Sequence, residues 1–120
     1  MPQILIVDDH ADIRRLLSIT LGKQFEILEA ENGAAALEVV RRHHPAVVLL
    51  DVMMPGAMDG FQVLETIKSN PTTADIVVAM VTARGQLADS EEAKRRGADA
   101  YFIKPFSPLQ VVNWVRGKMR

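Results

Sequence analysis

The chain has 120 residues, of which 48% are hydrophobic and 24% charged, and its formal net charge is −1. This composition is typical of one globular domain, and a charge so close to zero excludes a general electrostatic attraction to nucleic acid or to an anionic membrane. Because the sequence contains no cysteine, disulfides, thiolate catalysis and zinc–thiolate sites are excluded as well.

Short apolar runs and segments with helical periodicity alternate along the chain. The first run, Ile4–Val7, predicts a strand, and the spacing i, i+3, i+4, i+8 behind it predicts a helix with an apolar stripe of Ile13, Leu16, Leu17 and Leu21. The alternation continues with a weaker strand over Phe25–Leu28, a helix over Ala34–Arg42, a strand over Ala46–Leu50, a helix with a stripe of Phe61, Leu64 and Ile67, a strand over Ile76–Val81, a helix around Gln86–Arg96, a strand over Ala100–Ile103 and a helix with a stripe of Leu109, Val112, Val115 and Met119.

Continuous runs rich in Val and Ile are typical of strands that are covered on both faces, as in a parallel sheet. Five successive strand–helix units predict right-handed crossovers and a three-layer α/β sandwich with five strands and five helices. We expect one domain over residues 1–120, without an output domain. A cytoplasmic location is expected, because no run approaches the roughly 20 apolar residues of a membrane helix and the start has no signal-peptide pattern.

The helix around Gln86–Arg96 is the weakest of the five because it carries few large apolar residues. Two interpretations are open: an element that is easily displaced, or simply a solvated helix. Gly97 follows basic residues and is expected to end this helix in the left-handed conformation that glycine tolerates.

Polar residues follow four of the predicted strands. Asp8 and Asp9 follow the first strand, Asp51 the third, Thr82 the fourth and Lys104 the fifth. The carboxyl ends of parallel strands share one edge of the sheet, where open α/β folds bind their ligands. If the first and third strands are neighbours, three carboxylates converge at that edge.

Three converging carboxylates require positive charge nearby. Two unit charges about 5 Å apart repel each other by roughly 3 kcal/mol at an effective dielectric constant of about 20, and three acids make three such pairs. One lysine offsets only part of this repulsion, whereas a divalent cation fits, and oxygen ligands without cysteine favour Mg²⁺. Because an aspartate can become an acyl phosphate, the cluster predicts a Mg²⁺-assisted site for phosphoryl transfer to Asp51.

Each of these residues has a simpler interpretation when it is considered alone. Asp9 is a common type of N-cap for the first helix, and Asp51 is a common type of turn residue. Thr82 fits an ordinary strand end, and Lys104 fits a surface lysine. Their occurrence together, in this order at one sheet edge, favours a site.

The stretches ILIVDDHADIRRLL, VVLLDVMMPGAMDGFQVL, VVAMVTAR and GADAYFIKPF resemble a response-regulator receiver domain of two-component signalling, of the chemotaxis-regulator type. The similarity extends from Ile4 to Met119 and depends on the acid pair, the central Asp, the Thr and the Lys-Pro pair. It implies a flavodoxin-like fold with strand order 2-1-3-4-5, of which this family is itself a standard example.

The resemblance implies a role for each polar residue at the sheet edge. Asp51 accepts the phosphoryl group from a phosphohistidine of a histidine kinase or phosphotransfer protein. Asp9 and Asp51 bind Mg²⁺ directly, together with the backbone carbonyl of Met53, while Asp8 acts mainly through water. Lys104 pairs with the phosphoryl oxygens, and the peptide bond that follows Lys104 is expected to be cis.

The resemblance also implies a switch. Thr82 donates its hydroxyl to the phosphoryl group and moves when that group arrives, and Tyr101 follows it inward. The face of the fourth helix, fifth strand and fifth helix then changes for an output domain, a downstream protein or a second copy of the chain. The only catalysis expected is self-phosphorylation from a phosphodonor and slow autodephosphorylation.

Met53 and Arg84 correspond to positions that flank the phosphoryl group in the family. Arg84 either covers the site and changes the access of water, or is an exposed loop arginine. The loop after Asp51 departs from the usual pattern by one extra residue between Pro55 and Asp59, so a longer loop is expected beside the site.

Three features of the sequence remain outside this assignment. His43 and His44 fit a helix end better than a metal site, because adjacent helical residues face different sides. Trp114 lies off the apolar stripe of the last helix, and belongs either to a partner surface or to partial packing under a neighbouring loop. His10 is assigned no role.

Other functions conflict with particular residues. A phosphohydrolase acting on small molecules requires a second acid two residues after Asp51, where the chain has Met53. A nucleotide- or flavin-binding module requires a Gly-rich phosphate loop after the first strand, where the chain has Asp-Asp-His. A receiver that binds partners without being phosphorylated remains an alternative.

Overall fold

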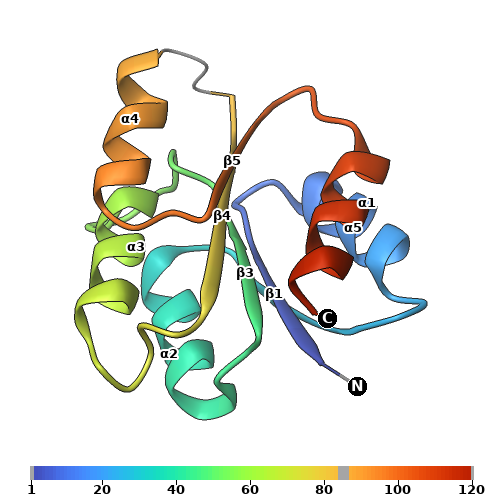
Figure 1. Cartoon of the computed structure of the whole chain (residues 1–120), viewed down its shortest axis with the longest axis horizontal. Coiled ribbons are helices and arrows are strands. Elements are labelled where there is room, and N and C mark those ends of the chain that lie inside the picture. The colour runs from blue at the N-terminus through green and yellow to red at the C-terminus, as the bar shows by residue number, and fades with distance from the viewer. Residues whose placement is uncertain (1, 84–86, 120) are drawn as a thin grey trace.

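The computed structural model describes residues 2–83 and 87–119, which form a parallel sheet with helices on both sides (Figure 1). All neighbouring strands are parallel, and the order β2-β1-β3-β4-β5 confirms the predicted flavodoxin-like fold. Within the described residues, no helix is long and apolar enough to span a bilayer. In chain order the elements are β1 (Gln3–Val7), α1 (Ala11–Leu21), β2 (Glu26–Ala30), α2 (Gly33–His43), β3 (Val47–Leu50), α3 (Gly60–Ser69), β4 (Val77–Thr82), α4 (Leu87–Arg95), β5 (Ala100–Ile103) and α5 (Pro108–Lys118).

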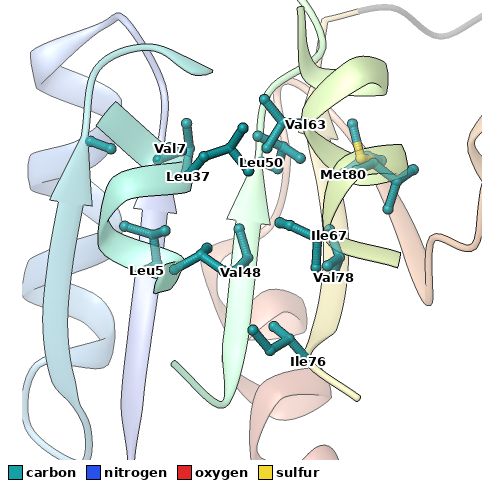
Figure 2. Packing of buried hydrophobic residues seen from close by; sticks show 14 of the residues in the cluster. Leu5, Val7, Leu37, Val48, Leu50, Val63, Ile67, Ile76, Val78 and Met80 are labelled. Atoms are coloured by element: carbon teal, nitrogen blue, oxygen red, sulfur yellow. The ribbon is translucent and has the colours of Figure 1, made fainter. Parts of the chain in front are cut away.

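Both faces of the sheet are covered, which explains why its strands are continuous apolar runs. Successive side chains of a strand point to opposite faces. In β1, Leu5 and Val7 therefore belong to the core with α2 and α3, whereas Ile4 and Ile6 belong to the core with α1 and α5. Figure 2 shows the first of these cores, where side chains from β1, β3 and β4 meet those of α2 and α3.

The fourth helix, α4, contributes little to the core. Ala93 is its one buried residue, whereas α3 buries five residues. The low burial predicted for this helix is therefore confirmed. Gly97 follows it with a φ of 101°, the left-handed conformation that was expected there.

The helices α3 and α1 begin in different ways. At α3, the Asp59 carboxylate accepts the Gln62 backbone N–H while the Gln62 side chain accepts the Asp59 backbone N–H, a reciprocal cap. The N-cap of α1 is His10, so the interpretation of Asp9 as a cap residue is wrong. The Asp8 carboxylate accepts the His10 backbone N–H instead, at 2.9 Å, because Asp8 is the residue that points back into the sheet edge.

Two residues of the predicted apolar stripes lie on the surface. Leu16 is 42% exposed and Leu109 is 64% exposed. The side chains of neighbouring helical residues point in directions about 100° apart, and each helix contacts the sheet along one narrow stripe. A residue beside this stripe is therefore exposed. For α1 this stripe runs through Leu17 and Leu21, and for α5 it runs through Val111, Val112 and Val115.

The histidine pair marks a helix end, as predicted. His43 is the last residue of α2, and His44 follows with a left-handed φ of 46°. The His44 ring contacts the carbonyl oxygen of Thr72 at 3.1 Å and the Asp75 carboxylate at 3.2 Å. Both histidines thus lie outside the cluster of acids at the carboxyl edge of the sheet.

Candidate functional site

The register between β1 and β3 places two acids side by side. Val7 pairs with Leu50, and Asp8 and Asp51 are the residues that directly follow these two strands. The Asp51 backbone N–H donates to the Val7 carbonyl oxygen at 3.0 Å, which extends the pairing by one step. Both acids are buried, whereas Asp9 is exposed.

The register between β4 and β5 positions the Lys104 ammonium at the same edge of the sheet. Thr82 pairs with Ile103, and Lys104 is the residue that follows β5. The Lys104 backbone N–H donates to the Thr82 carbonyl oxygen at 2.8 Å, and the Lys104–Pro105 bond is cis, as expected. The Thr82 side chain is fully buried next to this turn.

The three carboxylates lie close enough to share one cation. Ligand atoms of Asp8, Asp9, His10 and Asp51 all lie within 4.8 Å of one another. The Lys104 ammonium is 2.6 Å from Asp8 Oδ2 and 3.3 Å from Asp51 Oδ2. One ammonium therefore contacts two of the three carboxylates, and part of the negative charge of the cluster stays uncompensated when His10 is neutral.

The acids keep Lys104 charged. Burial is the largest single influence on its pKa and acts to lower it, but the hydrogen bond to Asp8 and the charges of Asp51 and Asp8 together outweigh burial, so the pKa is raised above the ordinary value. The ammonium is therefore present over the whole neutral pH range. It forms a fixed part of the site.

His10 belongs to the cluster, although its sequence position suggested no role. Its Nδ1 lies 3.0 Å from Asp8 Oδ1 and 3.2 Å from Asp9 Oδ1, and its side chain is 63% exposed. The hydrogen bond to Asp8, followed by the charges of Asp9 and Asp8, raises the pKa of His10 above its ordinary value. The signal available in the sequence was its place directly after the acid pair.

This arrangement predicts how the stability conferred by His10 depends on pH. A group whose pKa is raised in the folded state stabilises the fold below its unfolded pKa, about 6.5 for histidine, and loses that effect as pH rises through the folded pKa. In EDTA, His10→Gln should therefore lower the free energy of unfolding more at pH 5.5 than at pH 9. Urea denaturation at the two pH values measures the difference, and an equal loss at both would contradict it.

Arg14 is a second residue that sequence patterns did not identify. Its Nη1 donates to the Asp8 carbonyl oxygen at 2.7 Å, and its Nε donates to Glu29 at 3.1 Å. The side chain thereby ties α1 and the end of β1 to β2. This bridge fixes the backbone that carries Asp8 and Asp9.

A cleft of about 640 Å³ opens over the acids. Met53 and Thr82 line it together with Asp9, Asp51 and Lys104. The Met53 backbone N–H donates to Asp51 Oδ1 at 3.3 Å. The two acids that sequence analysis did not place here, Asp12 and Asp59, lie on the rim of the same cleft.

Two further sequence-based assignments fall elsewhere, and a third concerns a residue that the structure does not describe. Tyr101 is half-buried on β5 and packs against the core on the α2–α3 side, away from the residues that line the cleft. Arg84 lies outside the described residues. The loop segment Pro55–Met58 borders a separate hollow of about 360 Å³ with the start of α2, so the extra residue faces that helix.

Trp114 rests on the sheet through another aromatic side chain. Its ring meets Phe102 of β5 edge-on, with 5.8 Å between ring centroids, and the Lys118 ammonium lies 5.8 Å from the Trp114 centroid. The side chain is only half-buried. Trp114 is therefore partly packed against β5, and its role in a partner surface stays a prediction.

The donor set fits a divalent cation. All three carboxylates supply oxygen ligands, two of them from buried positions, and the single lysine leaves negative charge uncompensated. Hard cations such as Mg²⁺ prefer this set. The cluster could hold one ion between β1 and β3, with Met53 adjacent.

Comparison with known proteins agrees with this geometry. The sequence model of the response regulator receiver domain matches residues 4–116. The transcriptional regulatory protein SrrA of Staphylococcus aureus is 43% identical over 119 residues, covering 98% of this chain and 48% of SrrA. The chain thus spans about half the length of the curated relatives it matches.

Solved structures give the same result. The BeF3-activated receiver domain of DrrB superposes with a TM-score of 0.91 at 27% identity, covering 99% of this chain and 97% of that one. The chemotaxis protein CheY4 of Vibrio cholerae gives a TM-score of 0.89 at 28% identity, covering 98% of both chains. A CheY-like receiver domain protein of Methanospirillum hungatei gives a TM-score of 0.91 at 27% identity, covering 99% of this chain and 94% of that one.

Proposed function

The chain belongs to the response regulator receiver domain family, and on this premise we propose that it is a phosphoacceptor switch in which Asp51 takes a phosphoryl group from a phosphohistidine. The observation that carries the proposal is the burial of Asp51 beside Asp8 and the Lys104 ammonium, at the base of a cleft. A histidine kinase or phosphotransfer protein is the proposed donor. Residues 1–120 form one receiver, and the output lies in another domain or protein.

The residues that would hold Mg²⁺ are Asp9, Asp51 and the backbone carbonyl of Met53, with Asp8 acting through water. When bound, this ion supplies positive charge to the oxygens of the transferred phosphoryl group. The chain's own contribution is the Lys104 ammonium, which already lies between Asp8 and Asp51. A charge-spread transition state requires such fixed positive charge more than a proton donor.

The transfer itself needs no further catalytic group. A carboxylate oxygen of Asp51 forms a bond to phosphorus while the P–N bond of the phosphohistidine breaks. The imidazole keeps the electron pair of that bond and takes up a proton from water. Autodephosphorylation follows when a water molecule attacks the same phosphorus, returning the Asp51 carboxylate and inorganic phosphate.

The proposed readout is the face formed by α4, β5 and α5. Thr82 ends β4 beside the phosphoryl position, and Tyr101 lies on the neighbouring strand. Because α4 is held by little apolar burial, a change at Thr82 can displace it at low energetic cost. Each of these three elements carries one exposed large apolar side chain, which suits a partner or a second copy: Leu87 of α4, Ile103 of β5 and Leu109 of α5.

Intact mass spectrometry after incubation with acetyl phosphate tests the proposal. The wild type should gain one phosphoryl group with Mg²⁺ and none in EDTA, and Asp51→Asn should gain none. Asp75→Asn, at an exposed carboxylate outside the cluster, is the matched control and should react like the wild type. An adduct that survives Asp51→Asn contradicts the assignment, and a wild type that never reacts favours the phosphorylation-independent receiver.

A further inference from the structure

His10 brings a nitrogen donor into a cluster of oxygen donors. Among the described residues, it is the one non-carboxylate member of the group whose ligand atoms lie within 4.8 Å. Its Nδ1 is 3.0 Å from Asp8 Oδ1 and 3.2 Å from Asp9 Oδ1. Ligands about 2.1 Å from one ion, at right angles to each other, are about 3.0 Å apart. The contact with Asp8 is a hydrogen bond, but the 3.2 Å spacing between Nδ1 and Asp9 Oδ1 is close to that of two neighbouring ligands of one ion.

Asp8 is already occupied by groups of the protein. Its Oδ1 accepts the His10 backbone N–H at 2.9 Å, and its Oδ2 is 2.6 Å from the Lys104 ammonium. Asp9, in contrast, is exposed, and among residues 2–83 and 87–119 its ion-pair contact is with the His10 ring. A cation entering the cleft thus meets Asp9 and the His10 ring as exposed groups that can rearrange around it, next to the buried Asp51.

We propose that Nδ1 of His10 is a direct ligand of the divalent cation at this site, and that the site therefore prefers transition ions over Mg²⁺. This inference rests on the metal site of the proposed function. Imidazole favours ions such as Co²⁺, Ni²⁺ and Zn²⁺, whereas carboxylate and water favour Mg²⁺. The receiver then takes up a transition ion at concentrations where Mg²⁺ alone would leave it empty.

Isothermal titration calorimetry of the full chain with Co²⁺ and with Mg²⁺ tests the preference. Loss of an outer-shell partner typically costs about 10–100-fold in metal affinity, so loss of a direct ligand in His10→Gln should weaken Co²⁺ binding by at least about 10-fold, while Mg²⁺ binding should change less than about threefold. His43→Gln is the matched control, because His43 is exposed at the end of α2 and outside the cluster. It should leave both affinities unchanged.

A spectroscopic readout reports the ligand itself. Pulsed electron paramagnetic resonance of the Mn²⁺-loaded chain should show coupling to a directly bound nitrogen in the wild type and in His43→Gln, but none in His10→Gln. Nitrogen coupling that persists in His10→Gln, or equal weakening of Co²⁺ and Mg²⁺, overturns the inference. Phosphorylation of Asp51 with Mg²⁺ is a separate measurement, so failure of the proposed function is distinguished from failure of this inference.

Discussion

Replacing Gly60 by alanine should lower the free energy of unfolding by about 3 kcal/mol or more, although it adds a single methyl group. A Cβ at this position would lie 2.0 Å from the Asp51 carbonyl oxygen and 2.7 Å from the Val52 Cα. Both atoms belong to the backbone, so no side-chain rotation can relieve the overlap. The start of α3 must move away from the strand that carries the phosphoacceptor.

The contact at Gly60 also connects stability to the site. Its backbone N–H donates to the Val52 carbonyl oxygen at 2.8 Å, so α3 is fastened to the residue that follows Asp51. Moving this backbone displaces the Met53 carbonyl, a proposed cation ligand. Under conditions in which Gly60→Ala still folds, this variant should therefore bind Mg²⁺ more weakly than the wild type.

Gly117→Ala is the matched control for Gly60→Ala. A Cβ there meets nothing within 4 Å, and Gly117 lies in the last turn of α5. Alanine should therefore stabilise the fold by up to about 1 kcal/mol through helix propensity. Urea denaturation followed by far-UV circular dichroism measures both variants. Similar effects of the two substitutions would show that the close approach at Gly60 does not govern stability.

The fold was predictable because two simple features of the sequence act together. Alternating strand and helix periods define five units, and continuous runs such as Val47–Leu50 require cover on both faces. The order of the strands came from resemblance to a family, since periodicity alone does not say which strands are neighbours. The carboxyl-edge position of Asp8, Asp51 and Lys104 then follows from topology.

The parts that could not be predicted depend on side-chain direction. Leu16 and Leu17 look equivalent in the sequence, and only the angle at which α1 meets the sheet buries one and exposes the other. His10 and Arg14 act through contacts with Asp8 that no residue spacing encodes. Asp9 was a reasonable N-cap by type, but the N-cap position falls one residue later, at His10, and the helix begins at Ala11.

Lys104→Met should lower the free energy of unfolding by about 3 kcal/mol in EDTA, the second large effect expected. The change keeps the apolar stem and removes the ammonium that touches Asp8 and Asp51, two carboxylates whose side chains are 3% and 4% exposed. Removing one partner of a buried ion pair typically costs about 3–5 kcal/mol because the other charge is left uncompensated. Lys23→Met, at an exposed position, should change stability by less than about 0.5 kcal/mol.

The pH dependence of this loss has a definite sign. Because the pKa of Lys104 is raised in the fold, its stabilising effect is complete below the ordinary lysine pKa and disappears as pH rises through the folded value. The difference between wild type and Lys104→Met should therefore be constant from pH 7 to about pH 9.5 and shrink above about pH 10.4. Urea denaturation in EDTA over this range measures it.

Mg²⁺ should restore much of the stability that Lys104→Met loses. A ligand that binds only the folded chain adds about 2.7 kcal/mol at one hundred times its dissociation constant, and the variant presents the ion with more uncompensated negative charge than the wild type does. Mg²⁺ should therefore stabilise Lys104→Met more than it stabilises the wild type at the same concentration. If Lys104→Met is as stable as the wild type in EDTA, the buried carboxylates of Asp8 and Asp51 tolerate each other without a nearby positive charge. That result would also refute the argument that this site requires a cation.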